Sequence, residues 1–464
     1  SEVSNFGSME VTAVAVNYGS AQAYGIAVGS NASSVAGDGV VYNYGDIDIT
    51  AISENGNASA IGIDIAVGDY AFVENTGDIT LSASVEGSYG YGTTATAIGI
   101  NVVADYINIL NSGDITASAD NNSNYGASIA IGINAEAYTD ITISNSGDIS
   151  LTGSSGDGYY FGGYYPNYIY ITGDFVATGI NAESTLGSIA IDNSGDINIV
   201  DLNDGGIAGG FRTGDAFNGI SAKTILGDSS ITNSGDITIS GGEEVIGIVA
   251  STNFLKEYYD CPPPYDNGYY VCYNQTGGGD ATVVNSGDIS LTLGVEQQYA
   301  FNYGVGISAS TGKYGGNATV TNSGDITITN SANGDAVGIS ARSSGKYSVG
   351  SSIVNNTGDI SVTAPYSATG IYVASTNDSS IYNSGDITVA SEEGRARALY
   401  SVTDQVSMIS NSGDLSVVGG IGAIGVGSAG AYGATAINSG DVSVTSTRYE
   451  VLTNYYGEDY YAGG

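Results

Sequence analysis

The chain has 464 residues and carries 48 acidic against 9 basic side chains, which gives a formal net charge of −39 at pH 7. Glycine accounts for 71 residues but proline for only 5, which excludes a collagen-like chain, and a hydrophobic fraction of 42% excludes a disordered one. The negative charge disfavours nucleic acid and anionic lipid as partners. No apolar run reaches the roughly 18 residues of a membrane helix, so we expect no membrane insertion.

One short motif recurs along the whole chain. It consists of Asn, then Ser, Thr or Tyr, then Gly-Asp and an aliphatic residue, as in "TNSGDITIS" at 232–240 and "INSGDVSVT" at 437–445. A degenerate copy, "NFGSMEV", comes first, and successive copies are 27 to 52 residues apart. From the N-terminus, the motif glycines are Gly7, Gly45, Gly77, Gly113, Gly147, Gly195, Gly235, Gly287, Gly324, Gly358, Gly385, Gly413 and Gly440.

A second motif, Gly-Ile followed by small residues, lies inside most intervals, for example "IGINAE" from 131 and "VGISAR" from 337. A repeat whose shortest period is 27 residues is typical of one coil of a solenoid with loops of variable length. We therefore expect a single domain over 1–464, with loop insertions near 153–173 and 254–280.

The residues within the motif alternate as they do in a strand. Ile237 and Ile239 alternate with Thr238 and Ser240, which predicts a strand with one buried face and one solvent-exposed face. We expect Gly235 to turn the corner with a positive φ, which side chains with a Cβ resist. The sequence predicts an all-β fold, a parallel β-helix of about 12–13 coils with about three strands per coil.

Stacking at about 4.8 Å would place equivalent residues above one another. The motif asparagines would then form an inward amide ladder, each donating a hydrogen bond to the next, and the motif glycines would mark the corner. The central residues of this structural ladder are Asn233, Asn285, Asn322, Gly235, Gly287 and Gly324.

The combination of Gly-Ile and Asn-Ser-Gly-Asp motifs resembles the repeats of β-helical passenger regions in bacterial autotransporters and filamentous-haemagglutinin-like surface proteins. The resemblance covers nearly the whole chain and implies an extracellular or cell-surface protein that works in adhesion. Full-length members end in a membrane barrel that this sequence does not show. The chain is therefore either a released piece or reaches its place in another way.

The motif aspartates should line one edge, with a carboxylate at about every 4.8 Å. One interpretation is that each aspartate caps its turn through neighbouring backbone N–H groups. The alternative is a Ca²⁺ ladder, because stacked like charges repel and Ca²⁺ prefers oxygen ligands. No cofactor is otherwise required. The candidate Ca²⁺ ligands are Asp236, Asp288, Asp325, Asp359 and Asp386.

Signals for catalysis are poor, and we do not expect an enzyme. The absence of histidine excludes a His-based triad and a His-liganded zinc site. "GIGAIG" at 420–425 matches a dinucleotide-binding pattern, but it falls where the Gly-Ile motif belongs and no helix follows it. A β-helical polysaccharide-degrading enzyme remains an alternative, since such enzymes hold scattered acids in a groove.

Two loops depart from the repeat, and both are rich in tyrosine. In the second, Cys261 and Cys272 are the only cysteines, which predicts a local disulfide and an oxidising, extracellular setting. Exposed tyrosines suit contacts with glycans or cell surfaces, or else the loops fold down over the coil. The candidate contact residues are Tyr159, Tyr160, Tyr164, Tyr165, Tyr269 and Tyr270.

Sequons for N-glycosylation occur in a chain rich in Asn, Ser and Thr, where some are expected by chance. They place possible surface glycans at Asn31, Asn57, Asn121, Asn274, Asn317, Asn355 and Asn377.

A solenoid exposes unpaired strands at its first and last coils unless atypical segments cap them, and neither end of the sequence shows an amphipathic helix. We expect the chain to bind itself head to tail in an extracellular filament; the alternative is a passenger fragment of an adhesin. Edge strands near Asn5–Val16 and Tyr449–Tyr461 would form the junction. Its apolar seal would consist of Met9, Val11, Val451 and Leu452.

Overall fold

A computed structural model gives the fold of the chain. The structure describes residues 1–29, 37–87, 92–123, 126–155, 174–202, 215–252, 278–294, 302–312, 315–331, 333–343, 350–447, 450–453 and 459–462, and for the last two ranges the backbone alone. The described residues form strands, turns and bends without a helix. No described segment has the long apolar helix that could cross a membrane.

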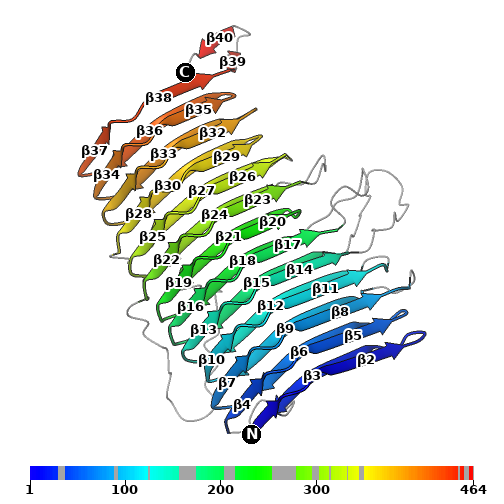
Figure 1. Ribbon diagram of the computed structural model, residues 1–464. Helices are drawn as coiled ribbons and strands as arrows, with labels where there is room; N and C mark the ends of the chain where they lie inside the picture. Colours follow the sequence, from blue (N-terminus) through cyan, green and yellow to red (C-terminus); the bar gives the residue numbers. More distant parts are fainter. Residues whose placement is uncertain are drawn as a thin grey trace, which may run out of the picture.

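Three parallel sheets run the length of a solenoid, whose coils follow one another from the N-terminal to the C-terminal end (Figure 1). Sheet A contains β1 (Glu2–Asn5), β4 (Gly39–Asn43), β7 (Tyr70–Asn75), β10 (Tyr106–Asn111), β13 (Ile141–Asn145), β16 (Ile189–Asn193), β19 (Ser229–Asn233), β22 (Ala281–Asn285), β25 (Ala318–Asn322), β28 (Ser352–Asn356), β31 (Ser379–Asn383), β34 (Val406–Asn411) and β37 (Gly433–Asn438).

Sheet B contains β2 (Met9–Ala15), β5 (Ile47–Ser53), β8 (Ile79–Val85), β11 (Ile115–Asn121), β14 (Ile149–Ser154), β17 (Ile197–Asp201), β20 (Ile237–Ser240), β23 (Ile289–Leu293), β26 (Ile326–Asn330), β29 (Ile360–Ala364), β32 (Ile387–Ser391), β35 (Leu415–Gly419) and β38 (Val442–Ser446).

Sheet C contains β3 (Ala21–Gly29), β6 (Ala58–Ala66), β9 (Thr94–Ala104), β12 (Ala127–Ala137), β15 (Phe175–Ser184), β18 (Ala216–Thr224), β21 (Glu244–Thr252), β24 (Asn302–Thr311), β27 (Gly334–Ser343), β30 (Ser367–Ser375), β33 (Arg395–Thr403) and β36 (Gly422–Gly430).

From β1 to β36, each coil thus contributes one strand to each sheet in turn, and the last coil adds β37 to sheet A and β38 to sheet B. Equivalent strands of successive coils pair in parallel. The predicted parallel β-helix with three strands per coil is confirmed. Every strand of sheet A ends at a motif asparagine, and the next strand of sheet B begins just after the motif aspartate or, in the first coil, its serine equivalent. The Asn-Ser-Gly-Asp motif is therefore the corner between these two sheets.

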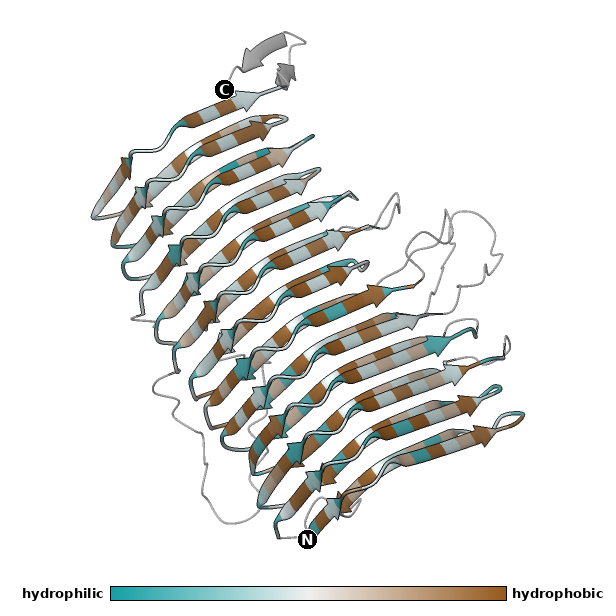
Figure 2. Cartoon of the chain, in the orientation of Figure 1, coloured by the Kyte–Doolittle hydropathy of each residue, from teal (hydrophilic) through white to brown (hydrophobic). Residues whose placement is uncertain are grey.

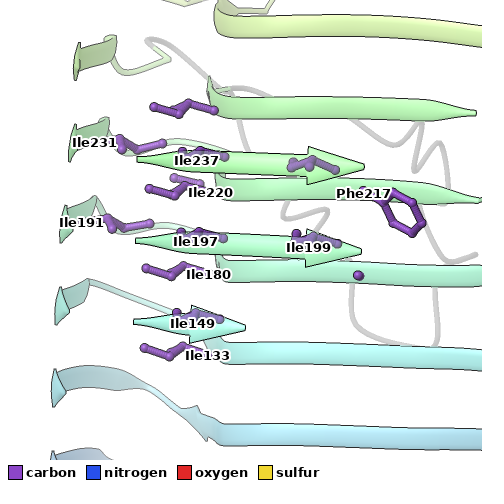
Figure 3. Close-up of a cluster of buried hydrophobic side chains, with 14 of the residues drawn as sticks. Ile133, Ile149, Ile180, Ile191, Ile197, Ile199, Phe217, Ile220, Ile231 and Ile237 are labelled. Atoms are coloured by element: carbon purple, nitrogen blue, oxygen red, sulfur yellow. The ribbon is translucent and has the colours of Figure 1, made fainter. Parts of the chain in front are cut away.

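The interior is filled by columns of aliphatic side chains. Ile197 of β17 pairs in register with Ile237 of β20, and both side chains are buried. Figure 3 shows such columns, with Ile180 and Ile220 of sheet C stacked in the same way. Along the strands, hydrophobic residues alternate with hydrophilic ones (Figure 2), because successive side chains point to opposite faces.

The motif glycine is needed for a reason that the sequence did not reveal. The positive φ expected at Gly235 is absent, and the described glycines with positive φ all lie outside the motif. Instead, a Cβ on Gly235 would come within 2.0 Å of the carbonyl oxygen of Gly195 in the preceding coil. The same approach is 2.0 to 2.3 Å for every copy from Gly45 to Gly440, so close backbone stacking at the corner requires glycine.

The glycine of the Gly-Ile motif has a similar role inside sheet C. A Cβ on Gly219 would lie 2.5 Å from the carbonyl oxygen of Gly247 and 2.8 Å from Cγ2 of Ile237. This glycine therefore makes room both for the next coil and for the isoleucine that follows the corner motif. The two motifs are thus packing partners across the interior.

The last two strands leave the solenoid pattern. β39 (Glu450–Thr453) and β40 (Asp459–Ala462) pair with each other in an antiparallel hairpin that belongs to none of the three sheets. Among the described residues, sheets A and B therefore have 13 strands, whereas sheet C has 12.

Candidate assembly surfaces

The amide ladder is continuous along the solenoid. Nδ2 of Asn233 donates to Oδ1 of Asn285 over 2.8 Å and to the carbonyl oxygen of Gly235 over 2.7 Å. From Asn5 to Asn438, each link between successive asparagines is 2.6 to 2.8 Å long. Every rung from Asn43 to Asn411 is buried. Each buried amide is therefore satisfied by its own corner and by its neighbours, as burial of a polar group requires.

The motif aspartates form a second ladder at the exposed side of the corner. The backbone N–H of Asp288 donates to Oδ1 of Asp236 over 2.8 Å, and the same bond joins the other candidate Ca²⁺ ligands, Asp325, Asp359 and Asp386, to their predecessors. One carboxylate oxygen of each rung thus holds the backbone of the next coil. Among the described residues no group of three or more acidic, cysteine or histidine side chains is arranged to hold a metal ion.

At the C-terminal end, the last coil exposes positions that earlier coils bury. Val442 and Val444 are 45% and 46% exposed, whereas Ile237, the equivalent of Val442 in a middle coil, is fully buried. Among the described strands, β36, β37 and β38 have a neighbour on one side only. Their outer edges are therefore open to strand pairing.

At the N-terminal end, β1, β2 and β3 are the corresponding edge strands. Met9 and Val11 of β2 pack against the core but remain half-exposed, and Phe6 at the corner is 78% exposed. The sequence-predicted residues Met9 and Val11 thus lie at an open edge. Val451 and Leu452 lie in β39, whose side chains are outside the described residues.

Both hydrogen-bond ladders stop at these edges with unused groups. Asn438 donates to the carbonyl oxygen of Gly440, but its amide has no further acceptor among the described residues. Asp441 Oδ1 accepts no hydrogen bond from a described donor, although its own N–H bonds to Asp414. At the other end, Ser8 stands in the aspartate position, because β1 and β4 pair at Asn5 and Asn43 while β2 and β5 pair at Met9 and Ile47.

The outer face of sheet C carries two side-chain groups that sequence reasoning missed. In β6 to β15, Nδ2 of Asn101 donates to Asp64 over 2.8 Å, and Asn134 and Asn181 extend this ladder with bonds of 2.9 and 3.0 Å. In the next column, Glu136 and Glu183 are in register and exposed. This part of the face is acidic and amide-rich.

The second group lies on the same face in β27 to β33. Tyr372 and Tyr400 stack with ring centroids 6.1 Å apart and an interplanar angle of 13°. The guanidinium carbon of Arg342 is 4.8 Å from the centroid of Tyr372, and that of Arg397 is 5.0 Å from the centroid of Tyr400. The sequence signal for this group lies at the third and fifth positions of the Gly-Ile motif, which change from "GINAE" to "GISAR" and "GIYVA" along the chain. The fifth residue of "GISAR" is Arg342, and the third residue of "GIYVA" is Tyr372.

Asp335 adds a carboxylate to this second group. Burial raises the pKa of its carboxyl above the ordinary 3.8, while the charge of Arg397 and a hydrogen bond from the backbone of Ser367 act in the opposite direction. Burial also raises the pKa of the neighbouring Tyr303 hydroxyl.

The structure contradicts one predicted glycosylation site, and several other predicted site residues lie outside the described residues. Asn121 is fully buried and its amide donates to the carbonyl oxygens of Thr93 and Ala127, so the folded chain does not offer it to a glycan. Asn57 and Asn317 are exposed, whereas Asn355 and Asn377 are half-buried. Outside the described residues lie Cys261, Cys272, the tyrosines Tyr159, Tyr160, Tyr164, Tyr165, Tyr269 and Tyr270, and the sequons at Asn31 and Asn274.

A groove of about 250 Å³ lies over the corners of β7, β10 and β13. Its lining includes one carboxylate, Glu74, together with Leu110 and Ser144.

Comparison with protein-family models, with curated proteins and with solved structures finds no match for this chain.

Proposed function

We propose that the chain is a non-catalytic extracellular structural protein whose copies stack head to tail into a surface filament. The observation that carries the proposal is that the two open ends complement each other rung for rung. A donor of the last amide rung and an acceptor of the last aspartate rung are unused, and the first coil presents the groups that would fill them. The contact between copies would be heterologous. Because it would not close on itself, repeated stacking would give a filament rather than a ring.

The expected junction follows from the interior register. Nδ2 of Asn438 would donate to Oδ1 of Asn5 in the next copy, and the N–H of Ser8 would donate to Asp441. Met9 and Val11 of the next copy would cover Val442 and Val444, which continue the same columns. Burying each such side chain contributes about 1.5–3 kcal/mol, so the apolar seal would supply most of the affinity.

Sheet C needs one more strand at this junction, because it has one strand fewer than the other sheets. β39 begins at Glu450, four residues after β38 ends at Ser446, and β33 begins four residues after the end of β32. We propose that β39 takes the missing position and gives up its pairing with β40 when the next copy binds. Val451 and Leu452 would then belong to the junction.

The experiment is electron microscopy and sedimentation of the purified chain at micromolar concentration. We expect filaments from the natural chain and monomers from a double variant, Val442→Asp with Val444→Asp, which places charges in the junction. Ser443→Asp is the matched control, since it lies between these positions on the opposite face of β38. Deleting residues 1–16 or 450–464 should also weaken or abolish filaments. A natural chain that remains monomeric would contradict the proposal.

We propose that calcium strengthens the contact between copies. The charge of −39 opposes contact between copies, and one oxygen of each ladder aspartate is not used by the backbone bond. Filaments should therefore be firmer with calcium or moderate salt than in chelator at low ionic strength. Equal filament yields in calcium and in chelator, at matched ionic strength, would show that calcium does not contribute to assembly.

The second candidate is a passenger segment of an adhesin, which rests on the resemblance of the repeats. Further coils of the same polypeptide would then cover the open edges. A purified chain that stays monomeric at high concentration, but whose end coils become protected when additional repeats are fused to them, would favour this candidate. Hydrogen exchange at β1 and β38 would report that protection.

A further inference from the structure

We infer that the outer face of sheet C binds the same face of a second copy, with the two solenoid axes antiparallel, so that Arg342 of each copy meets Glu136 of the other. The contact is lateral and does not depend on head-to-tail stacking. It follows from the register of the sheet and from the uneven distribution of charge on this face.

The charge distribution selects a carboxylate-bearing partner. The described basic side chains are Lys223, Arg342, Arg395 and Arg397, and all four lie in sheet C. Within the described residues, none of the three arginines forms an ion pair, and two of them lie over tyrosine rings. Nε of Arg342 donates to the hydroxyl of Ser340 over 3.2 Å, and stacking on the ring orients the guanidinium so that its terminal N–H groups can bind a planar carboxylate.

Carboxylates lie at matching positions on the other half of the same face. Register places Glu136, Glu183 and Arg342 in one column, with Lys223 between the acidic and basic ends. It places Asp64 and Tyr400 in the neighbouring column. The half of the face near the N-terminal end thus carries carboxylates and amides, whereas the described arginines all lie in the other half, together with the carboxylates of Glu244 and Asp335.

A single symmetry operation brings these groups together. A two-fold axis parallel to the strands and midway between β18 and β21 reverses the order of coils and keeps each position along the strand. In the sheet order, β12 and β27 are each fourth from an end, and β6 and β33 are each second from an end. Full overlap therefore sets Arg342 opposite Glu136, and the guanidinium of Arg397, over the ring of Tyr400, opposite Asp64.

The area suits a stable contact. Twelve strands at about 4.8 Å give a face about 55 Å long, and nine residues at about 3.3 Å give a width near 30 Å. This exceeds the roughly 800 Å² per partner of a standard interface. An isologous two-fold contact uses the same patch twice, so each ion pair occurs twice.

The test uses the full-length chain carrying Val442→Asp and Val444→Asp, so that end-to-end stacking cannot contribute to the mass. Sedimentation equilibrium near 0.15 M salt should show a dimer. Arg342→Glu should weaken association about tenfold or more, because two contacts become repulsive. Adding Glu136→Arg to the same chain should restore association, since the swapped charges face each other again across the two-fold axis. Lys223→Glu is the matched control; the axis sets it opposite Ser251, and it should have a small effect.

Several results would overturn the inference. A monomer at all concentrations, a dimer insensitive to Arg342→Glu, or a charge swap that fails to rescue would each do so. So would a Lys223→Glu effect as large as that of Arg342→Glu, which would indicate a general charge effect. Polygalacturonate is the probe for the competing occupant: a monomeric chain that binds it through Arg342 would replace the second copy with an acidic polysaccharide. These outcomes are independent of whether filaments form.

Discussion

A middle coil and the last coil carry almost the same corner sequence in different surroundings. Residues 232–240 read TNSGDITIS and residues 437–445 read INSGDVSVT. In both, the asparagine donates to its own corner glycine, over 2.7 Å at Asn233 and 2.6 Å at Asn438. Asn233 is buried, however, whereas Asn438 is exposed.

The two coils show that the shape of the corner and its stability have different sources. The motif shapes its own corner wherever it occurs, because the bond from the asparagine to the corner glycine spans only two residues. Burial comes from the coil that stacks on top, since a strand has an exposed edge until its neighbour arrives. A residue type in this repeat therefore predicts conformation everywhere but predicts burial only in coils that have two neighbours.

The largest expected effect comes from a charge in the middle coil. Ile237→Asp should cost at least about 4 kcal/mol of local unfolding free energy, because it buries a carboxylate without a partner. Val442→Asp, at the equivalent position of the last coil, should cost less than about 1 kcal/mol in the monomer. Hydrogen exchange at the flanking strands measures both. Similar costs at the two sites would contradict the difference in burial.

The corner glycine gives the next effect. Gly235→Ala should cost about 3 kcal/mol or more, since its Cβ would lie 2.0 Å from a backbone oxygen that cannot move aside. The variant should lose exchange protection in the coils on either side of the corner. Gly7→Ala is the control, because a Cβ there has nothing within 4 Å. If both variants were equally stable, close stacking would not explain the motif glycine.

A middle rung of the amide ladder should matter less than the glycine but more than the last rung. Asn233→Ala leaves an amide hydrogen of Asn193 and an oxygen of Asn285 without partners in a buried site, which should cost about 2–4 kcal/mol. Asn438→Ala should cost about 0.5 kcal/mol in the monomer. Thermal unfolding of the two variants, compared side by side, would show whether burial sets the value of a rung.

The smallest expected effect concerns Asp335. Its folded pKa is raised, so the folded state binds the proton more tightly and stability falls as the pH rises from the ordinary 3.8 through the raised value. Asp335→Asn should remove this fall, leaving stability slightly higher than in the natural chain at pH 7 and unchanged below pH 3.8. A variant that is less stable at pH 7 would mean that attraction to Arg397 outweighs burial.

The corner and the core could be predicted because they depend on a repeat that is visible in one dimension. The inward positions of Ile237 and Asn233 follow from strand alternation and from the identity of successive copies. The role of Gly235 could not be derived in this way. The sequence shows a glycine at this position but does not show whether a positive φ or a close approach requires it. The distance of 2.0 Å from a Cβ on Gly235 to a carbonyl oxygen of the neighbouring coil identifies close approach as the reason.

The assembly surfaces were only partly predictable. Met9 and Val11 could be assigned to an edge because they belong to the first motif copy. The outer face of sheet C could not, because Arg342 and Tyr372 lie in different intervals and meet only when loops of unequal length bring their strands into register. Asn121 was misassigned for the same reason, since its sequon is local while its burial is not.

The solenoid follows from the sequence alone, because identical corner residues, alternating aliphatic positions and small residues at fixed offsets permit stacking of parallel strands and little else. The three-dimensional arrangement was needed to show which rungs are buried, why the corner needs glycine, and which outward side chains share a column. The physical reason is that the repeat encodes contacts between equivalent positions. The register that aligns non-equivalent residues, and the exposure of the last coils, depend on what lies next to each coil in space.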